Sequence, residues 1–147
     1  NALPRAARVH FQAARRAAGH LLDAPCRKWV LHGDLHHGNV MKGRDGWRAI
    51  DPNPVWAPPA YAFGTVFRNP YGAPGRIEAT RLRRLTMLGA SALKTSPHLI
   101  LNWAFVRTAQ SIAWTIEDGA APPPTDLCLL RQLFDLAPLP RAQRTST

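Results

Sequence analysis

The chain has few acidic residues, few lysines, two cysteines and no long apolar run. Nine residues are Asp or Glu and nineteen are Lys or Arg, which gives a formal net charge of +10. Such a chain offers few carboxylates with which to surround a polycationic ligand. No stretch approaches the ~20 consecutive apolar residues of a membrane-spanning helix, so we expect no membrane partner. The N-terminus lacks an apolar run with a small-residue cleavage site, which argues against a signal peptide.

The two cysteines, Cys26 and Cys128, form no metal-binding or redox motif. We interpret them as small, buried or half-buried thiols of a cytoplasmic protein, and the sequence leaves a disulfide between them open. The chain opens at Asn1 without a methionine, and we expect it to be a fragment or a processed product. Its 147 residues, 46% of them hydrophobic, suffice for one globular domain with a core.

The excess of arginine raises the alternative of a basic, helical nucleic-acid-binding domain. The arginines are scattered, however. The densest groups, Arg15-Arg16 and Arg81-Arg83-Arg84, have helical spacing that is typical of a solvated face. Aromatic residues do not alternate with basic ones as they do in many RNA-binding surfaces. We therefore favour a protein without a nucleic-acid partner and keep this class as the alternative.

Apolar residues recur at steps of three and four through much of the chain, which predicts helices. In the helix predicted for 76–93, a buried stripe is expected to consist of Leu82, Leu85, Leu88 and Ala92. In the helix predicted for 98–116, Arg107 is the only formally charged residue, so this helix is expected to be largely buried. The predicted helices are 4–22, 61–68, 76–93, 98–116 and a last one that Thr125 caps.

The β structure is predicted to be small. Trp29–His32 reads as a short strand, and an Asp-Gly turn at 45–46 predicts a hairpin of 39–42 with 47–50. Four prolines within 52–59 predict an extended connector without regular structure. The expected fold class is therefore α+β and mostly helical, with a short β-hairpin.

The run His32-Gly33-Asp34-Leu35-His36-His37-Gly38-Asn39, followed by Ile50-Asp51-Pro52, carries the clearest chemical signal. One carboxylate can accept a proton from a hydroxyl, while an amide oxygen and a second carboxylate can hold Mg²⁺ against the phosphates of ATP. If the hairpin forms, Asp51 emerges close to the loop that carries Asp34. The order of these residues therefore indicates a phosphoryl-transfer site.

Two other interpretations use the same residues. His32, Asp34, His36 and His37 could bind Zn²⁺ or another transition metal, as in a metal-dependent hydrolase. The cluster could also be a polar turn without chemistry. The neighbouring glycines, Asn39 and Asp51 favour phosphoryl transfer over both.

The stretch His32–Val40 resembles the catalytic loop of the kinase-like antibiotic phosphotransferases. With Ala49–Pro52, Pro59–Tyr61 and Arg68–Pro70 it is similar to one branch, the aminoglycoside/hydroxyurea antibiotic resistance kinases. Further similarity continues downstream through Asn102–Phe105, Ala113-Trp114 and Glu117–Gly119. The resemblance covers most of residues 25–119 and implies a protein-kinase-like C-terminal lobe with the hairpin at its catalytic loop.

The resemblance also implies roles for single residues. Asp34 matches the general base for the acceptor hydroxyl, and Asn39 and Asp51 match the Mg²⁺ ligands. His36 falls where a side chain can contact the nucleotide phosphates, whereas His32 is expected to support the loop. The pair Glu117-Asp118, near the end of the predicted buried helix, is a candidate for contact with a cationic sugar, and a solvated helix end is its structural alternative.

The function that the resemblance implies is transfer of the γ-phosphate of ATP to an alcohol group of a small molecule. The co-substrate is ATP, the metal is Mg²⁺, and the partner is an antibiotic, most plausibly an aminoglycoside such as streptomycin. Residues 1–136 are then a C-terminal lobe without its N-terminal lobe, and 137–147 form a basic, disordered tail.

The chain also departs from the family pattern. No glycine-rich loop, strand lysine and helix glutamate precede the motif, and acidic residues of the family are replaced at Pro58 and Ala62. We therefore expect the chain to be weakly active or inactive by itself, and a noncatalytic kinase remnant is a further alternative.

Overall fold

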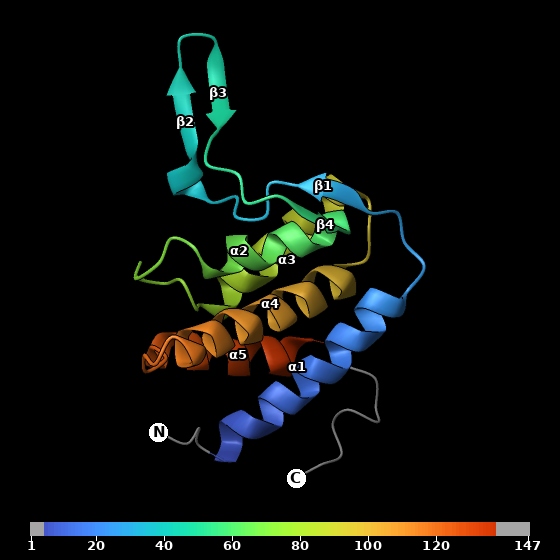
Figure 1. Cartoon of the computed structure of the whole chain (residues 1–147), viewed down its shortest axis with the longest axis vertical. Coiled ribbons are helices and arrows are strands. Elements are labelled where there is room, and N and C mark those ends of the chain that lie inside the picture. Colours follow the sequence, from blue (N-terminus) through green and yellow to red (C-terminus); the bar gives the residue numbers. More distant parts are fainter. Residues whose placement is uncertain (1–4, 138–147) are drawn as a thin grey trace.

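The structure, a computed structural model, describes residues 5–137 and contains five α-helices and two small antiparallel sheets within that range (Figure 1). This arrangement confirms the predicted α+β, mostly helical class. Of the tail predicted for 137–147, only Ala137 lies within the described residues. The elements are α1 (Arg5–Asp23), β1 (Trp29–Leu31), η1 (His37–Asn39), β2 (Val40–Gly43), β3 (Gly46–Ala49), β4 (Val55–Ala57), η2 (Pro59–Ala62), α2 (Phe63–Arg68), α3 (Ala79–Leu93), α4 (Pro97–Glu117) and α5 (Pro124–Leu136).

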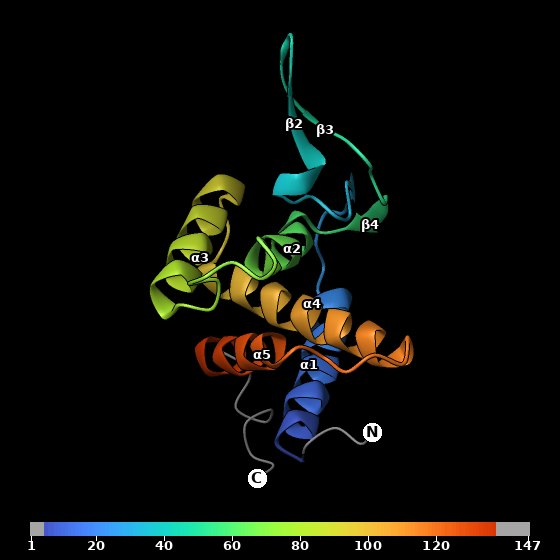
Figure 2. The same cartoon turned by 90° about the vertical axis from the view of Figure 1, so that its left-hand side faces the viewer.

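The α4 helix forms the centre of the domain and contacts all four other helices. Figure 2 shows α2 and α3 on one side of it and α1 and α5 on the other. Its start is fixed by Ser96, whose hydroxyl accepts a hydrogen bond from the His98 amide at 3.2 Å, and by Pro97 in the first turn. The central residues Trp103 to Ala109 are all buried, which confirms the prediction of a largely buried helix.

The hydrophobic core is formed where the helices meet around α4. Side chains from α2, α3, α4 and α5 fill it, and several of them are fully buried. The small residues Ala13, Ala14 and Ala17 of α1 let that helix approach α4 closely. The largest fully buried apolar side chains are Phe67, Leu82, Ile100, Phe105, Ile112, Leu129, Leu130 and Leu133.

The β elements lie at one end of the domain. The β2–β3 hairpin projects away from the helices (Figures 1 and 2), and its register pairs Val40 with Ala49. This confirms the hairpin predicted from the Asp45-Gly46 turn. The connector predicted for 52–59 is wrong in part, because β4 forms there and pairs with β1, with Leu31 opposite Val55. Because β4 is an edge strand of three residues, the flanking prolines do not interrupt its pairing.

Two further predictions are corrected in the helices. The α3 helix begins at Ala79, three residues later than predicted, and Leu88 and Ala92 are exposed while Thr86 and Gly89 are buried. The buried face is therefore rotated relative to the leucine stripe. The start of α5 is also different: Pro123 is the N-cap and Thr125 lies inside the first turn, since Pro124 suits the first helical position.

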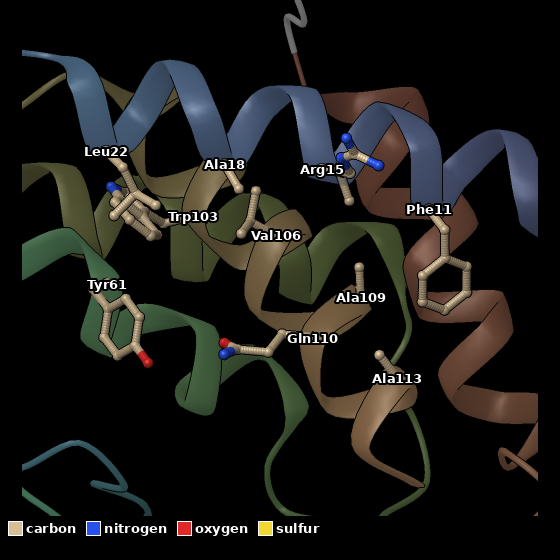
Figure 3. A pocket seen from close by; sticks show the side chains of 11 residues that line it. Phe11, Arg15, Ala18, Leu22, Tyr61, Trp103, Val106, Ala109, Gln110 and Ala113 are labelled. Atoms are coloured by element: carbon tan, nitrogen blue, oxygen red, sulfur yellow. The ribbon is translucent and has the colours of Figure 1, made fainter. Parts of the chain in front are cut away.

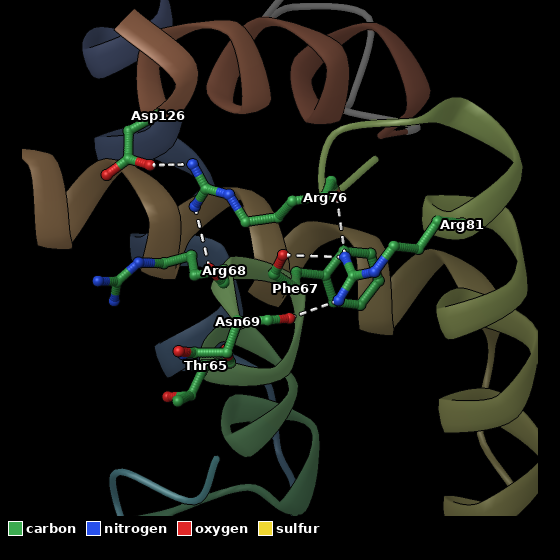
Figure 4. Close-up of polar contacts among 7 residues, drawn as sticks. All are labelled: Thr65, Phe67, Arg68, Asn69, Arg76, Arg81 and Asp126. Carbon is green, nitrogen blue, oxygen red and sulfur yellow. Dashed lines mark hydrogen bonds and ion pairs between the residues drawn. The ribbon is translucent and has the colours of Figure 1, made fainter. Parts of the chain in front are cut away.

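Charged side chains also hold the helices together. Arg76 and Asp126 form a buried ion pair at 2.7 Å, and Arg76 donates a second hydrogen bond to the Arg68 carbonyl at 3.0 Å (Figure 4). Arg81 donates to the carbonyls of Val66, Phe67 and Asn69. The last carbonyls of α2 lack partners within the helix, so these arginines supply both hydrogen bonds and favourable charge at its C-terminus.

We expect Asp126→Asn to lower the free energy of unfolding by about 3–5 kcal/mol, because it leaves the buried Arg76 cation without an anionic partner. The matched control is Asp45→Asn, which removes an exposed pair with Arg48 at 2.9 Å and should cost less than about 1 kcal/mol. Urea denaturation of both variants and of the parent chain measures the difference. Equal, small shifts for the two variants would show that the buried pair does not stabilise the fold.

Candidate active site

The loop after β1 is held against the segment before β4 by a close backbone contact. The Asn53 amide donates to the His32 carbonyl at 2.8 Å. Gly33 has φ of +80°, and a Cβ at this position would lie 1.7 Å from the Asn53 carbonyl oxygen. Only glycine has both the conformation and the space that this crossing requires. The next residue is Asp34, so the contact fixes the backbone position from which the Asp34 side chain extends.

Asp34 is half exposed, with 51% of its side chain accessible. Its carboxylate lies 3.6 Å from Nε2 of His36. Nδ1 of His36 accepts a hydrogen bond from the Gly38 amide at 3.0 Å, so the proton of the neutral imidazole is on Nε2 and faces Asp34. The predicted nucleotide contact, His36, is thus a direct neighbour of the predicted base.

Asn39 is joined to the same loop through its side chain. Its Nδ2 donates to the Asp34 carbonyl at 2.9 Å, and its Oδ1 accepts no hydrogen bond within residues 5–137. The Ile50 amide in turn donates to the Asn39 carbonyl at 3.0 Å. Asn39 and the residue before Asp51 are therefore linked at the base of the hairpin.

Asp51 is exposed and has φ of 54°, a left-handed conformation that is costly for a residue other than glycine. The neighbouring Ile50 is fixed on a second side, since Nε2 of His32 donates to its carbonyl at 2.8 Å. The supporting role predicted for His32 is what this hydrogen bond performs. The backbone thus brings the Asp34 loop, Asn39 and Asp51 to the same end of the domain.

A polar cavity of about 380 Å³ opens beside Asp34. Its wall combines the loop, the β4 segment, η2, α2 and α4. Asn39, Asp51 and His36 do not line it. The lining residues are Gly33, Asp34, Asn53, Pro54, Val55, Tyr61, Arg68, Arg107, Ser111 and Trp114.

Two arginines of this wall are absent from the residues predicted from the sequence. Burial lowers the pKa of Arg68, as do Arg107 and Arg76, whereas Asp126 and Asp34 oppose this decrease. Arg107 is 5% exposed. Its sequence signal is a single charge within 98–116, a stretch that is otherwise without formal charge, and a charge buried in such a stretch needs polar partners.

The predicted substrate residues lie further along α4. Glu117 is the last residue of the helix, Asp118 follows as its C-cap, and both are exposed. Neither lines the cavity. Asp118 follows Trp114 by four positions and Ser111 by seven, which places it on the same face of the helix as the cavity wall.

The transition-metal interpretation finds no geometric support in residues 5–137. Within that range, no three His, Cys, Asp or Glu side chains come together in a group that could hold a metal ion.

The described cysteines are free: Cys26 is exposed rather than buried, and Cys128 is partly buried. No described helix has the length and apolar character needed to cross a bilayer.

A second cavity, of about 390 Å³, lies between α1 and α4 (Figure 3). Tyr61 contributes to both cavities. Apart from Tyr61, its polar lining is Arg15 and Gln110, and the rest is apolar. No carboxylate or histidine lines it, whereas the cavity at Asp34 contains the carboxylate predicted to act as the base.

A model of the aminoglycoside/hydroxyurea antibiotic resistance kinase family matches residues 2–119. The chain belongs to this family. The match contains the whole loop, the hairpin and α4, and it confirms the resemblance drawn from the sequence. The family is one of kinases that confer antibiotic resistance, and the relatives below are named for small-molecule substrates.

Three curated relatives are similar to the chain. Streptomycin 3''-kinase of Klebsiella pneumoniae is 37% identical over 116 residues, which cover 72% of this chain and 42% of the relative. Streptomycin 6-kinase of Streptomyces glaucescens is 32% identical, covering 63% and 31%. Hydroxyurea phosphotransferase of Kitasatospora aureofaciens is 34% identical, covering 61% and 25%. The chain thus spans less than half the length of each of these relatives. No solved structure matches it significantly.

The contact at Gly33 leads to a prediction for the stability of this member of the family. Gly33→Ala should cost about 3 kcal/mol or more in unfolding free energy, because the added Cβ meets the Asn53 carbonyl in a left-handed turn. Gly72→Ala is the matched control: its φ is +73°, but nothing lies within 4 Å of the added Cβ. It should cost about 1–2 kcal/mol.

Urea denaturation of the two glycine variants separates the steric contact from the backbone conformation. A cost for Gly33→Ala no larger than that for Gly72→Ala would contradict the close crossing of the two segments.

Proposed function

We propose that the protein is a phosphotransferase that moves the γ-phosphate of ATP to an alcohol group of a small molecule. The observation that carries this proposal is the position of Asp34 in the wall of a polar cavity, where the Asn39 side chain donates a hydrogen bond to the Asp34 backbone carbonyl. A streptomycin-like aminoglycoside is the first candidate for the acceptor, because two of the relatives are named for streptomycin. The fold proposed for the region is the C-terminal lobe of a kinase-like enzyme.

In this mechanism Asp34 accepts the proton of the acceptor hydroxyl as the oxygen attacks the terminal phosphorus. The half-exposed carboxylate leaves room for a hydroxyl to approach. The transition state of phosphoryl transfer is loose, so the protein mainly has to position the reactants and neutralise charge. Nε2–H of His36, which faces Asp34 at 3.6 Å, is the group proposed to donate to a phosphate oxygen of the nucleotide, because Nδ1 is bonded to the Gly38 amide.

The metal ligands in the proposal are Oδ1 of Asn39 and the carboxylate of Asp51. Both are oxygen donors, which Mg²⁺ prefers, and the Ile50 amide ties the two segments together. Magnesium supplies neutralisation of the phosphate charge when it is bound. The role of the chain in this proposal is to hold the two donors near the loop, and the strained conformation of Asp51 is the cost of that placement.

Glu117 and Asp118 are proposed to contact a cationic part of the acceptor. Asp118 continues the face of α4 that carries Ser111 and Trp114, so a ligand leaving the cavity along the helix reaches it. Carboxylates at a helix C-terminus are unfavourable for the helix itself, which is consistent with a role in binding.

Because the chain spans 42% of the Klebsiella pneumoniae relative, the test uses a chimera. The part of that relative which precedes the matching segment is joined to this chain, and transfer of labelled phosphate from ATP to streptomycin is measured. We expect transfer by the chimera, little or none by the chain alone, and a decrease of at least about 10²-fold on Asp34→Asn.

Circular dichroism and a cooperative unfolding transition establish that each chimera is folded. A folded chimera without transfer to streptomycin would refute the streptomycin proposal, and hydroxyurea as acceptor would then test the wider class. A chimera whose Asp34→Asn variant remains fully active would exclude Asp34 as the base. A chimera inactive with both acceptors would identify the chain as a noncatalytic remnant.

The metal proposal has a separate test. Mn²⁺ replaces Mg²⁺ in the same chimera with ATP, and its binding is followed by electron paramagnetic resonance. Asp51→Asn and Asn39→Ala should each weaken binding about tenfold, the effect of losing one oxygen ligand. Asp45→Asn removes an exposed carboxylate from the hairpin turn and should leave binding unchanged. Equal binding by all variants would place the metal elsewhere.

A further inference from the structure

The cavity at Asp34 has an unusual charge balance for a site that would bind a cationic antibiotic. Three of its lining residues carry charge: Asp34, Arg68 and Arg107. The two arginines outnumber the carboxylate, and the other polar groups of the wall, which include those of Asn53, Tyr61 and Ser111, are uncharged side chains. The lining thus carries a net positive charge, which attracts anions.

Arg107 is held in this wall by contacts that no exposed arginine would have. The residue is 5% exposed, and its guanidinium carbon lies 4.3 Å from the Tyr61 ring centroid and 5.7 Å from that of Trp114. Gly64 of α2 allows the approach, since a Cβ there would lie 2.1 Å from the Arg107 Cβ. A buried cation packed this closely is a built feature of the fold.

The hydrogen bonds of Arg107 are incomplete. Nη1 donates to Oε1 of Gln110 at 2.6 Å, and Nε is buried without a partner. No carboxylate within residues 5–137 forms a salt bridge with it. A buried guanidinium whose donors are not satisfied is costly unless a ligand completes them.

Arg68 repeats the pattern from α2. Among the described residues its guanidinium donates no hydrogen bond and forms no salt bridge, and its Nε is buried without a partner (Figure 4). The carboxylate of Asp126, which could have paired with it, is bonded to Arg76 instead. Burial lowers the pKa of Arg68 below its ordinary value, so the cation is held in a site that disfavours its charge.

We propose that Arg68 and Arg107 bind an oxyanion, a phosphate or a carboxylate, in the cavity beside Asp34. A guanidinium offers planar, paired N–H donors that match the oxygens of such a group. The oxyanion has two possible sources, the phosphoryl group that is transferred or an acid group on the acceptor. Its use during transfer rests on the proposed function, whereas binding of an oxyanion by the chain does not.

The test is a titration of the 147-residue chain with inorganic phosphate, followed by ³¹P NMR at constant ionic strength. Arg68→Gln and Arg107→Gln should each weaken phosphate binding about tenfold, as expected for one lost charge-assisted contact. Arg83→Gln removes the same charge from the exposed face of α3 and is the control; it should leave binding unchanged. Asp34→Asn should strengthen binding, because it removes a negative charge from the cavity wall.

Arg107→Gln tests the site only if this variant is folded and unfolds cooperatively. If it does not, the test rests on Arg68→Gln, because Arg68 is less buried. A parallel titration with acetate distinguishes the sources. Tighter binding of phosphate indicates the transferred group, and equal or tighter binding of acetate indicates an acid group on the acceptor.

The proposal is overturned if neither anion binds, or if Arg68→Gln and Arg83→Gln weaken binding equally, since the effect is then one of net charge. This outcome is independent of the chimera assay. An active chimera with no anion binding would refute only the oxyanion site. An inactive chimera with intact anion binding would refute only the proposed transferase function.

Discussion

The arrangement of the site depends on one backbone crossing, where Gly33 passes against the carbonyl of Asn53. The β1–β4 pairing and the hydrogen bond from Asn53 to His32 hold the two segments at this distance. Because these contacts use backbone atoms, they constrain the chain whatever the neighbouring side chains are. Asp34 follows the crossing on one segment and Asp51 precedes it on the other, so this contact fixes the backbones of two segments whose aspartates are seventeen positions apart in sequence. The strain at Asp51 is then a local cost that the surrounding hydrogen bonds offset.

The α4 helix contributes both to the core and to the wall of the cavity at Asp34. Most of its middle is buried among the other helices, which fixes its axis and rotation. That rotation determines that Arg107, Ser111 and Trp114 face the cavity while Phe105 and Ile112 face the core. The stabilising and functional faces therefore cannot be changed independently. Burial of Arg107 costs free energy, and the apolar packing around it is what keeps the cation in place when no ligand is present.

Much of the fold follows from local sequence signals. The helical period located the helices to within a few residues, and the Asp45-Gly46 turn located the hairpin, because these signals act over a few positions. The β4 strand was missed since Pro54 and Pro58 argue against a strand unless it is a short edge strand. The motif predicts Asp34 and Asn39 as site residues, and the structure places Asp34 in the cavity wall with the Asn39 side chain bonded to the Asp34 carbonyl. Arg68 and Arg107 were not, because they are thirty-nine positions apart and only the packing of α2 on α4 brings them to one cavity.

The charge of the cavity and the position of Asp118 together constrain the shape of an acceptor. If transfer takes place at Asp34 as proposed, the two arginines beside it repel a cationic group there, and the reacting hydroxyl then has to belong to a neutral or anionic part of the molecule. Carboxylates occur on the same face of α4 only from Asp118 onward, about 10 Å along the helix axis from Ser111. A polycation can satisfy both conditions only if it is elongated, with its hydroxyl at one end and its charge about 10 Å away. A compact cation meets the arginines wherever it enters, whereas a small neutral acceptor needs no contact with Asp118 at all.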